Sequence, residues 1–123
     1  MNALRALGVS EIDADHREFV SRLKRLISCS DTDFPPLFQE LLAHTSEHFL
    51  KEGTLMRETN FGELFMHESE HQRVLTEMKE LNRGIRRGRL SLVRAHVKEN
   101  LSEWFDKHLS LMDSMLMSHL KQL

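Results

Sequence analysis

Two pairs of potential metal ligands stand four residues apart, in segments whose apolar residues recur with helical spacing. One pair is His48 and Glu52, and the other is His67 and His71. Residues four apart lie one turn above each other on one face of an α-helix, so each pair can direct two ligand atoms toward one point. This spacing predicts helices that present ligands to a shared interior.

Helical periodicity dominates the rest of the chain, and no segment alternates for long enough to predict a strand. Four helices are predicted, at about 13–29, 36–58, 63–82 and 90–120. Asp13 is expected to cap the first helix, and Pro35-Pro36 to open the second. Amphipathic helices joined by short loops predict an all-α fold, an antiparallel up-down-up-down four-helix bundle in one domain over residues 1–123.

The antiparallel arrangement also predicts which ligands meet, because the start of one helix then lies beside the end of the next. His16 is early in the first predicted helix, and His108 and Asp113 are past the middle of the fourth. His48 and Glu52 lie near the end of the second predicted helix, and His67 and His71 lie near the start of the third. All seven candidates are therefore expected in one layer at the same end of the bundle.

The spacing of His108 and Asp113 is the least regular of the set. They are five residues apart, and at 3.6 residues per turn five residues do not return to the same face. A π-bulge, or a long reach by Asp113, is required to bring both to one site, and such bulges favour functional sites.

The number of ligands predicts two metal ions rather than one. A first-row ion such as iron takes about six ligands, so two ions offer about twelve positions. Five imidazoles, two bridging carboxylates and one bridging solvent oxygen fill all but one of them. An open position on a redox-active ion is where a small molecule such as O₂ binds.

The chain resembles the hemerythrin family over about residues 8–117. The motifs that carry the resemblance are Ile12-Asp13-Ala14-Asp15-His16, His48-Phe49-Leu50-Lys51-Glu52, His67-Glu68-Ser69-Glu70-His71, and Trp104-Phe105-Asp106-Lys107-His108 continuing to Asp113. The resemblance implies a non-haem diiron site.

In that site, the resemblance assigns His67, His71 and His108 to one iron and His16 and His48 to the other. Glu52 and Asp113 bridge the two irons, together with an oxo or hydroxo group.

The resemblance further implies reversible O₂ binding at the open position of the two-histidine iron. Phe49 and Phe105 are candidates for the oxygen pocket. Phe105 stands where the family usually has a leucine, and Gly53 stands where bacterial members often have an acidic residue. Both departures bear on the kinetics of oxygen binding rather than on the ligand set.

The biological role stays open between oxygen carriage or storage and oxygen or redox sensing. The long last helix, apolar through Leu116 and Leu120, suggests the sensory domain of a larger signalling protein. A diiron enzyme that reduces peroxide or nitric oxide is the alternative, which the single open position disfavours, so no enzymatic activity is expected. A ferritin-like carboxylate site is also disfavoured, because only Glu68 and His71 form the E-x-x-H pair that it requires twice.

Composition narrows the remaining function classes. A net charge of −2 gives no reason to expect nucleic-acid binding. No apolar run is long enough to span a membrane. A single cysteine, Cys29, and no signal pattern predict a cytoplasmic protein. The other histidines, His44, His96 and His119, are expected to lie outside the metal site.

Overall fold

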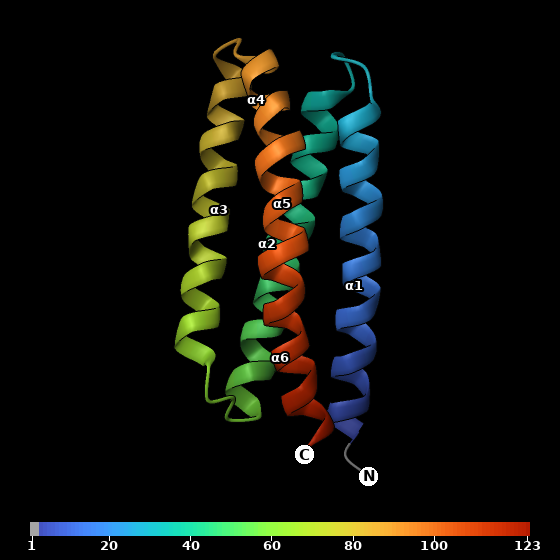
Figure 1. The fold of residues 1–123 in the computed structure, drawn as a ribbon, viewed down its shortest axis with the longest axis vertical. Helices are drawn as coiled ribbons and strands as arrows, with labels where there is room; N and C mark the ends of the chain where they lie inside the picture. The colour runs from blue at the N-terminus through green and yellow to red at the C-terminus, as the bar shows by residue number, and fades with distance from the viewer. Residues whose placement is uncertain (1–2) are drawn as a thin grey trace.

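Four antiparallel helices form the structure, a computed structural model that describes residues 3–123 except for the side chains of residues 3–8 and 108–110. Its elements are α1 (Ala3–Ser28), α2 (Phe34–Glu58), α3 (Leu64–Arg86), and a continuous fourth run of α4 (Leu90–His96), η1 (Val97–Leu101), α5 (Ser102–Trp104), η2 (Phe105–Leu109) and α6 (Ser110–Lys121). Helix α2 packs against α1 and α3, α6 packs against α1, and α4 packs against α3. Figure 1 shows both chain ends at the same end of the bundle. The predicted all-α four-helix bundle is confirmed.

The first helix begins at Ala3, before the predicted start at Asp13. The prediction that Asp13 caps this helix is wrong, because Asp13 lies in its interior with an exposed side chain. Ile12 is buried against Leu116 and Leu120 near the far end of the chain. Because Ile12 packs against the core, the turn of α1 before Asp13 is held in a helical conformation by tertiary contacts.

The second and third helices both end where a residue adopts positive φ. Asn60 has φ of 54°, and the Phe61 N–H donates to the carbonyl of Met56 at 3.0 Å. Gly88 has φ of 77°, and the N–H of the residue after it donates to the Gly84 carbonyl at 2.9 Å. These bonds, made across a left-handed residue, satisfy carbonyls that the helix ends leave unpaired. Helix α3 therefore passes through Gly84 and ends later than predicted.

Two apolar clusters fill the bundle, and the predicted ligands lie between them. The larger cluster surrounds residues such as Phe38, Met78 and Trp104, and the smaller one contains Ile12, Met56, Phe61, Leu116 and Leu120. Along every helix the ligand positions separate members of one cluster from members of the other. The apolar layers on both sides keep water away from the polar layer.

The fourth run contains two π-helical segments, η1 and η2, among its α-helical turns. The backbone of His108 lies in η2, and Asp113 lies shortly after it in α6. A π-helix closes its hydrogen bonds over five residues instead of four, so it turns residues five apart toward a common face. The π-helical irregularity thus includes the backbone of His108 and ends at Leu109, before the α-helical turn that carries Asp113. No helix within the described part of the chain is long and apolar enough to cross a membrane.

Candidate metal centre

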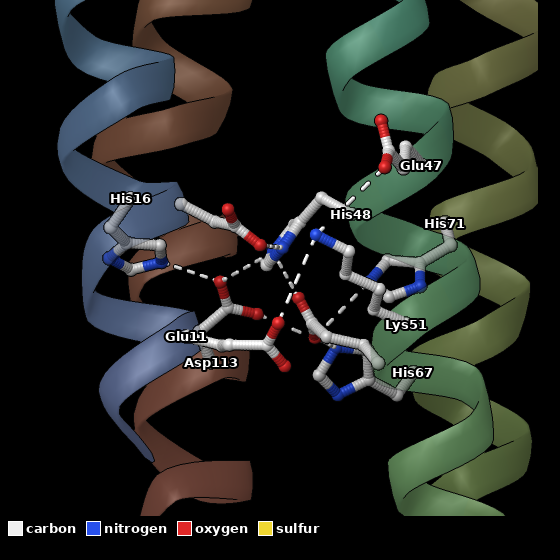
Figure 2. Close-up of polar contacts among 10 residues, drawn as sticks. Glu11, His16, Glu47, His48, Lys51, His67, His71 and Asp113 are labelled. Atoms are coloured by element: carbon white, nitrogen blue, oxygen red, sulfur yellow. Dashed lines mark hydrogen bonds and ion pairs between the residues drawn. The ribbon is translucent and has the colours of Figure 1, made fainter. Parts of the chain in front are cut away.

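Six of the seven predicted ligands have described side chains, and these converge in one layer. Figure 2 shows His16, His48, His67, His71 and Asp113 directed toward one another. The six come from four helical elements: His16 from α1, His48 and Glu52 from α2, His67 and His71 from α3, and Asp113 from α6. The side chain of His108 lies outside the described residues.

Glu52 lies between histidines of the second and third helices. Its Oε1 atom is 2.9 Å from His67 Nε2 and 3.7 Å from His71 Nε2, and its Oε2 atom contacts His48 Nε2. Only 1% of Glu52 is exposed. The carboxylate thus presents one oxygen to α3 and the other to its own helix, which is the arrangement that a bridging ligand requires.

Asp113 lies in the same layer on the opposite side. Its Oδ2 atom is 2.5 Å from His16 Nε2 and 3.7 Å from His48 Nε2. Its Oδ1 atom is 3.6 Å from His67 Nε2. The residue is fully buried. Like Glu52, it separates two groups of histidines and directs one oxygen toward each.

Several buried atoms in this layer have no hydrogen-bond partner of good geometry. They are Nε2 of His48, His67 and His71, both carboxylate oxygens of Glu52, and Oδ1 of Asp113. Buried polar atoms are normally paired, and leaving them unpaired is costly. In addition, Glu52, His67, His71 and Asp113 each place a ligand atom within 4.8 Å of the others. Unpaired imidazole and carboxylate atoms that face a common point fit metal ions as their missing partners.

The two carboxylates decide the charge of the metal-free cluster. Burial by itself lowers the pKa of His48, but the close carboxylates of Asp113 and Glu52 outweigh it and raise that pKa to about 11. The same balance raises the pKa of His67 to about 9. Burial opposes the charge on Asp113 too, yet the hydrogen bond from His16 and the nearby imidazoles of His48 and His67 hold its pKa well below the usual range. In the absence of metal, protonated His48 and His67 therefore balance the negative charge of the carboxylates.

The pKa of His71 shifts in the opposite direction. Burial, reinforced by repulsion from His67, lowers its pKa to about 3. Its ring is therefore neutral at ordinary pH, with Nε2 facing Glu52. A neutral imidazole is the form that binds a metal ion, so this ligand needs no deprotonation before binding.

We predict that the metal-free protein is most stable near pH 6.5. The stabilisation from His48 and His67 is complete below their ordinary pKa of 6.5 and is lost as pH rises through about 9 and then about 11. His71 acts on the acid side: its lowered pKa makes stability fall as pH drops from 6.5 toward 3. Denaturant unfolding of chelator-treated protein at several pH values measures both limbs.

Replacing His67 with glutamine tests the origin of the alkaline limb. This variant is expected to lose part of the decline between pH 6.5 and 9, because it lacks the group that titrates there. A wild-type unfolding free energy that stays constant over that range contradicts the prediction.

The two candidate pocket residues lie against different histidines. The Phe105 ring is 5.5 Å from the ring of His16 and stacks on Phe19 at 5.0 Å. The Phe49 ring instead stacks on His71, with centroids 3.6 Å apart and planes within 5°. Phe105 therefore lies beside His16 of the predicted open ion, whereas Phe49 stacks on a histidine assigned to the other ion and lies 6.0 Å from the ring of His48.

The space beside Gly53 is occupied by the ion pair between Arg57, on the next turn of α2, and Glu68, on α3. A Cβ atom at Gly53 would lie 2.9 Å from Oε1 of Glu68 and 3.2 Å from the guanidinium of Arg57. These two side chains are joined at 2.7 Å across α2 and α3. The glycine thus admits an acidic side chain from α3, at a position where the sequence lacks one on α2.

The remaining histidines take no part in the cluster. Nε2 of His96 is 2.6 Å from Glu77 Oε1, and Nε2 of His119 is 3.0 Å from the carbonyl of Thr59. His44 is partly buried and lies outside the group of converging ligand atoms. They are not needed to explain the metal centre.

Comparison with known proteins agrees with this geometry. Residues 7–120 match the family model described as Hemerythrin HHE cation binding domain. A bacteriohemerythrin of Ralstonia nicotianae (strain ATCC BAA-1114 / GMI1000) is 35% identical over 116 residues, which cover 94% of this chain and 84% of that protein. No solved structure matches the chain significantly.

Proposed function

Because this chain belongs to the hemerythrin family, we propose that its buried cluster holds two non-haem iron ions and reversibly binds O₂. The observation that carries the proposal is the set of unpaired imidazole and carboxylate atoms between the two apolar clusters. Imidazole nitrogens and carboxylate oxygens that lack partners of good geometry are the ligands that iron prefers.

The ligand assignment follows the family resemblance, and the positions of the six described side chains support it. We propose that His67, His71 and His108 hold one iron, and that His16 and His48 hold the other. Glu52 and Asp113 bridge them, because each directs its two oxygens toward different histidines. An oxo or hydroxo group completes the bridge. When bound, the two irons supply the electrons that reduce O₂ reversibly.

The oxygen site is proposed on the side of His16 and His48, where the ion has one protein ligand fewer. Phe105 lies against His16 and is itself stacked on Phe19, so an aromatic wall borders this side. Apolar walls keep water and protons away from a reduced oxygen species. This surrounding favours reversible binding over further reduction, and family membership likewise agrees with a binding protein rather than an enzyme.

The structure accounts for the apolar end of the last helix without a signalling partner. Leu116 and Leu120 are both fully buried, against Ile12 and Met56. The residues that suggested continuation into a larger protein therefore serve the core of this bundle. Oxygen carriage or storage is the role that we propose, with sensing as the second candidate.

Visible absorption of the reduced, iron-loaded protein tests the proposal. Exposure to O₂ is expected to give a new charge-transfer band that disappears when O₂ is removed under argon, over repeated cycles. Zinc-loaded protein serves as the control and shows no band, because zinc has no redox chemistry. Rapid irreversible oxidation without a lasting adduct contradicts carriage, and fewer than two irons per chain in fully loaded protein contradicts the diiron site.

A further inference from the structure

A carboxylate outside the proposed ligand set contacts one of the proposed ligands. Oδ2 of Asp15, on α1, is 2.7 Å from Nδ1 of His48, on α2. The side chains are only 18% and 7% exposed. The contact therefore joins two helices at the edge of the buried layer, where water competes weakly for either group.

The two ring nitrogens of His48 face in different directions. Nε2 contacts Glu52 and is 3.7 Å from Asp113, whereas Nδ1 faces Asp15. A carboxylate that accepts a hydrogen bond from Nδ1–H keeps the proton on that nitrogen and leaves the Nε2 lone pair available for a metal. The same hydrogen bond fixes the rotation of the imidazole ring about its Cβ–Cγ bond.

The ammonium group of Lys51 lies close to carboxylates other than Asp15. Nζ of Lys51 lies 3.9 Å from Glu11 Oε1 and 4.0 Å from Glu47 Oε1, and Figure 2 draws this cation reaching toward those two residues. Lys51 thus bridges two exposed carboxylates on the surface next to His48. The carboxylate of Asp15 instead faces the imidazole of His48.

We propose that Asp15 is a positioning residue for the metal ion held by His16 and His48. It directly precedes His16, so one turn of α1 supplies a ligand and also orients the second histidine of that ion. This inference rests on the proposed diiron function. It predicts a defect at one ion only, because the histidines of α3 have no contact with Asp15 in the described structure.

Replacing Asp15 with alanine tests the inference on the iron-loaded protein. The rate of iron transfer to a chelator is expected to become biphasic, with one iron per chain leaving about 10–100-fold faster and the other at the wild-type rate. Asp15→Asn, which keeps an acceptor oxygen without the charge, is expected to restore part of the retention. Asp13→Ala is the matched control, because Asp13 is an exposed carboxylate on the same helix.

Cobalt substitution provides a readout that simple loss of stability does not change. The visible bands of the cobalt-loaded Asp15→Ala protein are expected to change for one ion only, whereas a uniform loss of stability leaves the bands of both ions unchanged. If Asp15→Ala retains both ions at wild-type rates with unchanged cobalt bands, the inference is wrong. If wild type itself fails to hold two ions, the diiron proposal fails instead, and the two failures are thereby distinguished.

Discussion

Replacing Asp113 with alanine is expected to leave the protein unable to retain two iron ions. Asp113 is the carboxylate that faces His16 and His48 with one oxygen and His67 with the other. Its removal therefore takes a ligand from both proposed ions at once. Loss of even an outer partner of a metal ligand weakens binding about 10–100-fold, so loss of this bridge is expected to exceed that range.

Iron per chain after gel filtration, together with the visible spectrum, measures the effect. Asp113→Asn keeps the shape of the side chain but removes its charge, and it is expected to lose iron as well because a neutral amide is a weaker ligand. Asp106→Asn is the matched control, since Asp106 is an exposed aspartate of the same helical run. An Asp113→Ala protein with two irons and a wild-type spectrum contradicts the bridging assignment.

Iron loading is expected to raise the unfolding temperature by about 10 °C or more. Without metal, the layer contains buried imidazole and carboxylate atoms that lack partners of good geometry. A ligand present at a hundredfold excess over its Kd stabilises the folded state by about 2.7 kcal/mol per site. For a chain of this size, each kcal/mol corresponds to a shift of roughly 3–6 °C.

Thermal unfolding followed by circular dichroism compares metal-free protein with anaerobically loaded Fe(II) protein. Addition of a chelator before heating is expected to reverse the shift. Magnesium at the same concentration is the control ion, because it prefers oxygen ligands and retains its water, and it is expected to have little effect. Equal unfolding temperatures for metal-free and iron-loaded protein contradict a structural role for the metals.

The predictions that depended on a single helix agree with the structure. His48 and Glu52, and likewise His67 and His71, share a face because four residues make about one helical turn, whatever surrounds the helix. The end of α2 at Glu58 also agrees with the prediction, because Asn60 is a residue type that tolerates positive φ, whereas α3 continues past its predicted end to Arg86. Local geometry follows from local sequence.

Predictions that depended on packing between helices were less complete. Asp13 has the chemistry of a helix cap, but tertiary burial of Ile12 extends α1 beyond it. Phe49 was predicted as a candidate for the oxygen pocket, and packing places its ring on His71 and 6.0 Å from the ring of His48. Neither outcome follows from propensity, because each depends on a neighbour that is distant in the sequence.

The sequence by itself determined the bundle, the spacing of the ligands, and the need for an irregular turn between His108 and Asp113. Only the tertiary structure decided which oxygen of each carboxylate faces which histidine, and that Asp15 meets His48 across two helices. The physical reason is that periodicity specifies the direction of a side chain around its own helix. The rotation and axial offset between helices are set by the apolar layers on either side of the site.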